Sequence, residues 1–142
     1  MTELRDSLLD TYITAYRDLI VSERVSSDSV TLSLPLHLAA GHRIEVTVTD
    51  IGNNGCILSD GARTLNEVRA AGFSLTEQMQ SKLESVAILS GVRVVDETLV
   101  LECRHNEVGV KIQRFAELCK MIGDVYLGPV TKQVVQIGSS LA

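Results

Sequence analysis

The chain has 142 residues, a formal net charge of −5 and a pI near 5.1. A chain of this length buries about 68–70% of its unfolded surface, so we expect a single domain over residues 1–142 with its own core. The acidic balance argues against a protein that binds bare phosphate backbones through clustered cations. Aromatic residues make up 4% of the chain and Trp is absent, so platforms for stacking single-stranded bases are scarce.

Targeting signals and cysteine usage narrow the class further. The N-terminus has no charged and then apolar signal, and no apolar run approaches 18 residues, so we expect a cytoplasmic protein that spans no membrane. The cysteines Cys56, Cys103 and Cys119 are odd in number, and no pair has the spacing of a metal knuckle or a redox dithiol. We expect reduced thiols, with Cys56 and Cys119 buried as small apolar side chains.

An amphipathic helix is the first predicted element, from Thr2 to Val21. Its apolar residues recur at steps of three and four: Leu4, Leu8, Tyr12, Ala15, Tyr16 and Leu19. Alternation from Val30 to Leu36 then predicts a half-buried strand, and Pro35 favours an edge position because proline has no N–H for a ladder. A second alternating strand is predicted from Arg43 to Thr49.

Two antiparallel hairpins are predicted from short polar turns. Asn53-Asn54-Gly55 tolerates positive φ, so the strand that ends near Thr49 should pair with Cys56–Ser59. Later in the chain, Val92–Val95 and Thr98–Cys103 read as strands joined by the two residues Asp96-Glu97.

Two helices are predicted between the hairpins, Leu65–Ala71 and Leu75–Leu89. Each is preceded by residues three apart with the spacing of a capping box, in which two side chains bond free N–H groups of the first turn. These pairs are Thr64 with Glu67 and Ser74 with Glu77.

The last predicted helix runs from about Glu107 to Tyr126, and Gly128-Pro129 is expected to end it. Its inward residues should be Ile112, Phe115, Leu118, Cys119 and Ile122. The C-terminal tail, residues 127–142, contains the apolar run Val134–Ile137, which we leave open as an added strand or a frayed end.

The element order is therefore helix, three strands, two helices, two strands and helix. It lacks the alternating rhythm of a parallel α/β protein. We predict an α+β fold with a mainly antiparallel five-stranded sheet and helices packed on it.

Four segments resemble, in order and spacing, the bacterial and prophage proteins of the domain of unknown function 1828 family: residues 43–48, 58–65, 71–75 and 91–94. The family-like core covers about 28–126. Residues that fit the family's most specific segment are Leu58, Asp60, Thr64 and Leu65. Gly61 stands where the family has a second Asp, Ala62 where it has Gly, and Arg43 where it has an acidic residue. The resemblance implies a fold of this kind and a phage or mobile-element origin.

Carboxylates on the first hairpin are the candidate catalytic groups. Glu45, Asp50 and Asp60 would need to converge to hold Mg²⁺ for phosphodiester cleavage. A supporting Lys is missing, because none occurs before Lys82. Asp60 is better explained as a turn residue that bonds its own backbone ahead of the helix, and Glu45 and Asp50 as a solvated strand face and a turn entry.

Histidines offer no stronger site. His37 and His42, with Cys56 across a hairpin, fall short of the four donors that zinc takes and match no familiar spacing. No Gly-x-Ser-x-Gly turn is present, and the Gly52–Gly55 run lacks the Lys of a phosphate-binding loop. We therefore predict no catalytic residue, metal or cofactor.

The preferred hypothesis is a non-enzymatic binding module that acts by protein–protein interaction. A phage or mobile-element protein that inhibits or modulates a host defence complex is the particular form suggested by the resemblance. The predicted binding residues are Arg43, Glu45, Asp60, Arg63, Lys111 and Arg114. Spare apolar surface on the first or last helix also predicts a homodimer.

Two alternatives stay open at this level. One is a metal-dependent hydrolase or nuclease that uses Asp60 with Glu45 or Asp50. The other is a nucleic-acid-associated regulator whose last helix places Lys111, Arg114 and Lys120 on phosphates, although a solvated helix face is the more frequent explanation of such cations.

Overall fold

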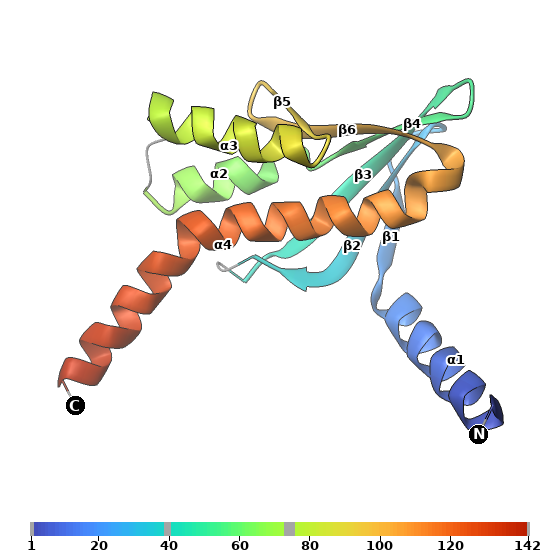
Figure 1. The fold of residues 1–142 in the computed structure, drawn as a ribbon, viewed down its shortest axis with the longest axis horizontal. Coiled ribbons are helices and arrows are strands. Elements are labelled where there is room, and N and C mark those ends of the chain that lie inside the picture. Colours follow the sequence, from blue (N-terminus) through green and yellow to red (C-terminus); the bar gives the residue numbers. More distant parts are fainter. Residues whose placement is uncertain (1, 39–40, 73–75, 142) are drawn as a thin grey trace.

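The computed structural model describes residues 2–38, 41–72 and 76–141, and the side chains within 3–38, 41–72 and 76–124. These residues form an α+β fold with four α-helices and an antiparallel sheet of six strands in the order β1-β2-β3-β4-β6-β5 (Figure 1). The strands are β1 Val21–Arg24, β2 Ser29–His37, β3 Arg43–Gly52, β4 Gly55–Ser59, β5 Arg93–Val95 and β6 Thr98–Arg104. The predicted α+β class and antiparallel sheet are confirmed, and the predicted strand count is one short.

The missing strand is β1, which follows the first helix directly. Its four residues are all exposed, so it carries no apolar alternation by which the sequence would reveal it. Because β1 pairs with β2 from Val30 to Ser33, β2 is an inner strand and the predicted edge position is wrong. Pro35 is tolerated there because it lies beyond Ser33, where the register with β3 is interrupted until His37.

Both predicted hairpins are confirmed. β3 and β4 are joined by Asn53 and Asn54, whose φ angles are 53° and 60°. β5 and β6 are joined by Asp96 and Glu97, with φ angles of 49° and 65°. Two successive left-handed residues match the right-handed twist of the strands, so even Glu97 adopts a conformation that asparagine or glycine would hold with less strain.

The helices are α1 Thr2–Leu19, α2 Arg63–Ala70, α3 Glu77–Leu89 and α4 Val108–Leu141, with a short 3₁₀ turn at His105–Glu107 before α4. The predicted end of the last helix at Gly128-Pro129 is wrong, because α4 continues to Leu141. The tail is therefore helical, and it is neither an added strand nor a frayed end. A proline within a helix removes one hydrogen bond and bends the axis, and α4 changes direction along its C-terminal part (Figure 1).

The predicted capping boxes are not the devices that start α2 and α3. The N-cap of α2 is Ala62, which makes no side-chain cap, while Thr64 is buried inside the first turn. The N-cap of α3 is Thr76, whose hydroxyl accepts a hydrogen bond from the Met79 N–H at 3.2 Å. Ser74 of the second predicted box lies outside the described residues.

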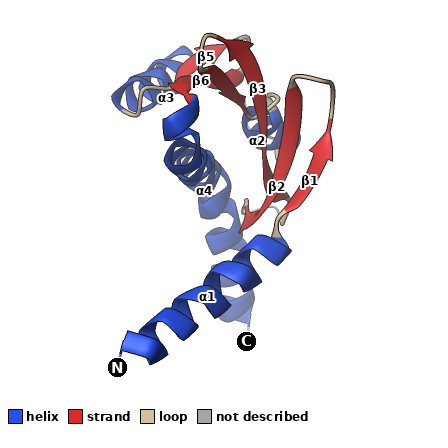
Figure 2. Cartoon of the chain, turned by 90° about the vertical axis from the view of Figure 1, so that its right-hand side faces the viewer, coloured by secondary structure: helices blue, strands red, loops and turns tan. Residues whose placement is uncertain are grey.

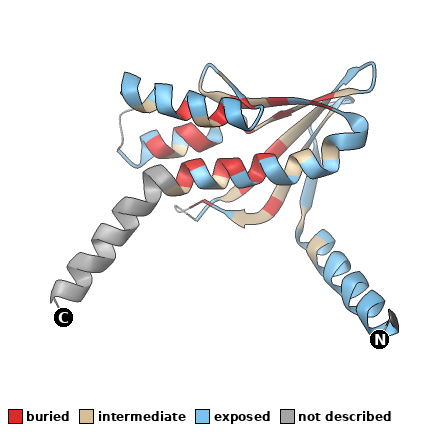
Figure 3. Cartoon of the chain, viewed as in Figure 1, coloured by how far each residue is buried: buried red, intermediate tan, exposed pale blue. Residues whose placement is uncertain are grey.

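The core lies between one face of the sheet and the helices α2, α3 and α4, and it is visible as the buried positions in Figure 3. Alternate strand residues supply one side of it: Leu34, Ile44, Val46, Leu58, Leu99 and Leu101. Of the residues predicted to face inward on the last helix, Phe115, Leu118, Cys119 and Ile122 are buried and Ile112 is partly buried. No helix within the described ranges has both the length and the apolar character needed to cross a membrane.

The first helix stands apart from this core. α1 projects away from the sheet in both views of the chain (Figures 1 and 2). Its side chains from Glu3 to Ile13 are exposed without exception. The predicted amphipathic helix is confirmed, but its apolar face is not part of the core.

Candidate binding surface

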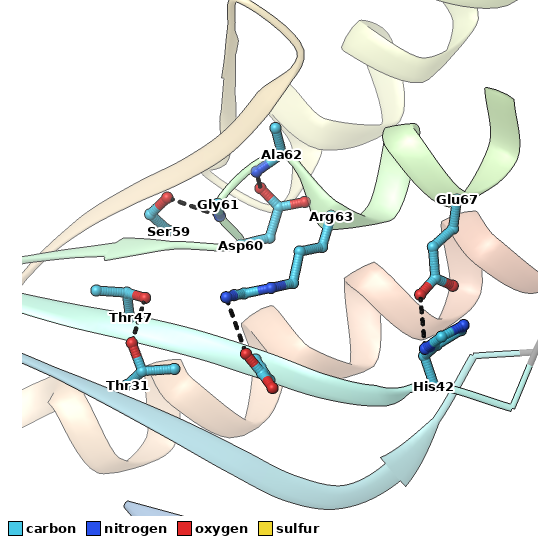
Figure 4. A network of polar contacts seen from close by, with 10 residues as sticks. Thr31, His42, Thr47, Ser59, Asp60, Gly61, Ala62, Arg63 and Glu67 are labelled. Carbon is cyan, nitrogen blue, oxygen red and sulfur yellow. Dashed lines mark hydrogen bonds and ion pairs between the residues drawn. The ribbon is translucent and has the colours of Figure 1, made fainter. Parts of the chain in front are cut away.

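Asp60 holds the junction between β4 and α2. Its Oδ1 atom accepts a hydrogen bond from the N–H group of Ala62 at 3.0 Å (Figure 4). The same atom accepts one from the N–H group of Leu99 at 2.9 Å, and its Oδ2 atom accepts one from Thr64 at 3.2 Å. Only 1% of the residue is exposed. The predicted turn role is confirmed, and the bond to Leu99 extends it by tying the turn to β6. This carboxylate leaves no surface for a partner to contact.

Arg43 also serves the fold. Its Nε atom donates to the carbonyl of Leu34 at 2.9 Å, and its Nη2 atom donates to the carbonyl of Ser33 at 3.1 Å. The same nitrogen donates to the carbonyl of Leu19, the last residue of α1. The guanidinium therefore joins the end of α1 to β2, and these donors already have backbone carbonyls as acceptors.

Glu45 and Arg63 form an ion pair at the surface. The distance from Arg63 Nη2 to Glu45 Oε2 is 2.9 Å, and the two side chains are 49% and 34% exposed for Arg63 and Glu45. Glu45 alternates with buried neighbours on β3, so it lies on the sheet face opposite the core. Nearby on that face, the hydroxyls of Thr31 and Thr47 share a hydrogen bond of 2.8 Å (Figure 4). This pair is accessible, but each charge already has a partner.

Asp50 is occupied at the opposite end of β3. Its Oδ1 atom accepts from the Gly52 N–H at 2.9 Å and lies 3.3 Å from His105 Nε2. The Gly52 hydrogen bond, followed by that of His105, lowers the pKa of Asp50 below its ordinary value. The three candidate carboxylates therefore have separate partners, and no group of three or more His, Cys, Asp or Glu side chains is arranged for a metal ion among the residues that the structure describes.

His42 lies beside an acid that is partly withdrawn from solvent. The distance from His42 Nδ1 to Glu67 Oε1 is 3.9 Å (Figure 4). Within the described part of the chain, the second oxygen of Glu67 is buried without a hydrogen-bond partner, and desolvation raises the pKa of Glu67. The other two residues of the imagined zinc set lie elsewhere: His37 is exposed at the end of β2, and Cys56 is buried in the core.

The cysteines are three free, buried thiols. Burial is the main cause that raises the pKa of each of them, and it raises the pKa of Cys119 to about 12, with a smaller contribution from Asp60. Cys56 and Cys103 stand opposite each other on β4 and β6. The predicted burial of Cys56 and Cys119 is confirmed.

The surviving candidate surface is a crevice of about 520 Å³ between the C-terminal end of α3 and the N-terminal half of α4. Its apolar lining consists of Leu89, Val92, Leu101, Phe115, Leu118 and Met121. Three charged side chains of α4 also line the crevice, and they are Lys111, Arg114 and Glu117. Neither cation forms a salt bridge with any residue in the portion of the chain with described side chains.

The third cation of the predicted basic face is separate in function. Lys120 Nζ donates to the carbonyl of His37 at 3.2 Å and to Asp124 Oδ2 at 3.2 Å. It therefore joins α4 to the end of β2, and it does not line the crevice with Lys111 and Arg114. The predicted trio is divided into one structural lysine and two available cations.

The exposed apolar residues beside these cations were not predicted from the sequence. Leu89 is 88% exposed and Met121 is 45% exposed. Helical periodicity gave no signal for Leu89, because two adjacent apolar residues on a helix can both be buried, as Leu118 and Cys119 are on α4. Sequence order did not show that the end of α3 lies beside α4.

Comparison of the chain with protein-family models, with curated proteins and with solved structures gave no match. The resemblance to the domain of unknown function 1828 family stays a prediction.

Proposed function

We propose that this protein is a non-enzymatic binding module that holds a segment of a partner protein in the crevice between α3 and α4. The observation that carries the proposal is the position of Lys111 and Arg114, two cations without salt-bridge partners among the described side chains, beside an apolar lining. A segment that combines Asp or Glu with a large apolar side chain has the complementary chemistry. The apolar side chain would cover Leu89 and Met121, and the acid would meet the cations.

The composition of the crevice favours a protein segment over nucleic acid. Affinity for phosphate backbones grows with the number of cations that displace counterions, and here two cations share the crevice with Glu117. Lys120, the third cation of the nucleic-acid hypothesis, already bonds His37 and Asp124. The formal net charge of −5 opposes a polyanion further.

A metal-dependent hydrolase receives no comparable support. Glu45 pairs with Arg63, Asp50 lies beside His105, and Asp60 accepts backbone N–H groups. A two-metal or one-metal site needs such carboxylates to converge on the same ion. We therefore rank this alternative below binding.

The biological setting of the proposal comes from the sequence resemblance. A phage or mobile-element protein in the host cytoplasm would use this crevice to bind a subunit of a host defence complex and so inhibit or modulate it. The acidic and apolar segment would then belong to that subunit. The sequence resemblance supports this setting, whereas the geometry of the crevice supports the binding of a protein segment.

A library of displayed random peptides tests the binding proposal directly, because the selection requires no identified partner. Peptides selected on the wild-type protein should be enriched in Asp or Glu next to Leu, Ile, Met or Phe. The double variant K111E/R114E should bind a selected, fluorescently labelled peptide at least about 10-fold more weakly, because reversal of both charges opposes the acid.

The matched control is K82E/R104E, which makes the same change in net charge at exposed residues outside the crevice. It should bind the peptide within about 2-fold of wild type. Equal losses in both double variants, selected peptides without acidic residues, or a selection that yields no peptide would each contradict the proposal.

A further inference from the structure

The second unexplained surface is the apolar half of α1. Several large apolar residues of this helix are each between 48% and 67% exposed: Leu4, Leu8, Leu9, Tyr12, Ile13 and Leu19. With 3.6 residues per turn, these side chains fall in about one half of the helix circumference, and Arg5 is the one charged residue among the described residues of that half. Most of the stability of a helix in a protein comes from packing of its apolar face, so the exposed face of α1 is unfavourable without a cover.

The base of α1 is fixed, so its apolar half is held in one direction. Arg43 donates to the carbonyl of Leu19, and the Tyr16 hydroxyl donates to Gln113 Oε1 of α4 at 3.4 Å. The rings of Tyr12 and Tyr16 stack with centroids 6.3 Å apart. The surface is therefore partly ordered before any partner arrives, which lowers the entropic cost of association.

The charges beside this surface indicate what covers it. Asp6 and Arg17 lie at the same border of the apolar half, within about 20° of each other around the helix. The point midway between them falls between Thr11 and Tyr12, about one residue from the centre of the helix Thr2–Leu19. In an antiparallel pair of identical helices, each border meets the same border of the partner, so each Asp6 would meet the other copy's Arg17. Leu4 and Leu19 would lie level in the same way.

We propose that α1 pairs with α1 of a second copy of this chain in an antiparallel, two-fold symmetric dimer. A parallel pair brings opposite borders together and leaves Asp6 and Arg17 without this match. A helix of 18 residues is about 27 Å long, and an interface built on it falls below the roughly 1,200 Å² of standard interfaces. We therefore expect a micromolar dimer. The crevice between α3 and α4 is not involved, so the dimer does not depend on the proposed function.

Sedimentation equilibrium on the full chain with charge-reversed variants is the test. D6R places a second arginine opposite Arg17, and R17D places a second aspartate opposite Asp6, so each variant alone should dissociate at least about 10-fold more readily than wild type. An equimolar mixture of D6R and R17D should form a heterodimer, and the double variant D6R/R17D should regain the wild-type dimer. D28R is the control for D6R, because it makes the same charge change at an exposed turn residue outside α1.

Several results would overturn the proposal. A wild-type protein that stays monomeric at about 200 µM would show that α1 is covered by something other than a second copy. A D6R variant that dimerises like D28R would place the interface elsewhere. Failure of both the mixture and the double variant to recover the dimer would exclude the antiparallel register. Circular dichroism that matches wild type confirms that each variant is folded, and K111E/R114E should dimerise normally even if the crevice binds no peptide.

Discussion

The first half of α4 and the whole of α1 have apolar residues at similar spacing, but those of α4 are buried and those of α1 are exposed. On α4, Phe115, Leu118 and Ile122 are between 1% and 5% exposed, whereas on α1 Leu8 and Tyr12 are 61% and 67% exposed. Both faces would gain by leaving water, at about 25 cal/mol per Å² of apolar area. The spacing of apolar residues therefore indicates which face of a helix is favourable to bury, and it does not indicate which surface packs against that face.

The position of each helix explains the difference. α4 follows β6 and crosses the core face of the sheet together with α2 and α3 (Figure 1). α1 precedes β1, which is one of the two edge strands of the sheet, and it projects away from the sheet (Figure 1). Four predictions test this contrast between the packed core of the sheet and helices α2 to α4 and the exposed helix α1.

The largest expected effect on the free energy of unfolding is at Asp60, which is buried at the junction of β4 and α2. Asp60→Ala removes the acceptor of the Ala62, Thr64 and Leu99 N–H groups, and a buried donor left unpaired costs about 1–3 kcal/mol. We expect a loss of about 3–5 kcal/mol in the free energy of unfolding, measured with urea. Asp60→Asn keeps one acceptor oxygen and should lose less. A loss below about 1 kcal/mol for Asp60→Ala would mean that the hydrogen bonds of Asp60 contribute little to the stability of the fold.

A second effect should appear at alkaline pH. The pKa of Cys119 rises from 9.0 to about 12 on folding, so its contribution is complete below about pH 9 and is lost as the pH rises toward 12, because only the unfolded thiol ionises there. Between about pH 9 and 10.5 this should remove about 2 kcal/mol of stability. Urea unfolding at both pH values measures the loss, and Cys119→Ala should show a smaller one. Equal pH dependence in both proteins would contradict the assignment.

Ala62 offers a smaller change in the opposite direction. It adopts φ 64°, a left-handed conformation that costs a residue with a Cβ about 1–2 kcal/mol. Ala62→Gly should therefore raise the free energy of unfolding by up to about 1 kcal/mol, since glycine also has more entropy to lose. Glycine is the residue that the resembled family carries at this position. Thermal unfolding is the measurement, and a lower midpoint would show that the Ala62 methyl group contributes packing that outweighs strain.

The smallest effect is expected on α1. At concentrations that keep the chain monomeric, Leu8→Ala should change the free energy of unfolding by less than about 0.5 kcal/mol, because this side chain is already exposed. Leu58→Ala, its counterpart in the core, should cost about 2–5 kcal/mol. Similar losses at the two leucines would mean that α1 packs against the body in solution, and the contrast would fail.

Local patterns predicted what depends on near neighbours. The left-handed turn at Asn53-Asn54, the inward residues of α4 and the turn role of Asp60 all follow from residues close in sequence. Those features were predictable because turn chemistry and helical periodicity act over a few residues.

Features that depend on distant residues were not predicted. The bond from the Leu99 N–H to Asp60 spans 39 positions, and the bond from Arg43 to the Leu19 carbonyl spans 24. β1 is defined by its pairing with β2, since its own residues are exposed. The same limit applies to the binding crevice, whose walls come from the C-terminal end of α3 with the residues that follow it and from α4, segments about 20 positions apart in the sequence.

Amide hydrogen exchange at two protein concentrations tests most directly whether α1 is closed by a second copy. The amides of α1 from Leu8 to Leu19 should exchange more slowly at about 200 µM than at about 2 µM, because dimer formation protects the helix. The amides of β4 and β6 serve as the internal reference and should be unchanged. Exchange in α1 that is equally fast at both concentrations would contradict the account.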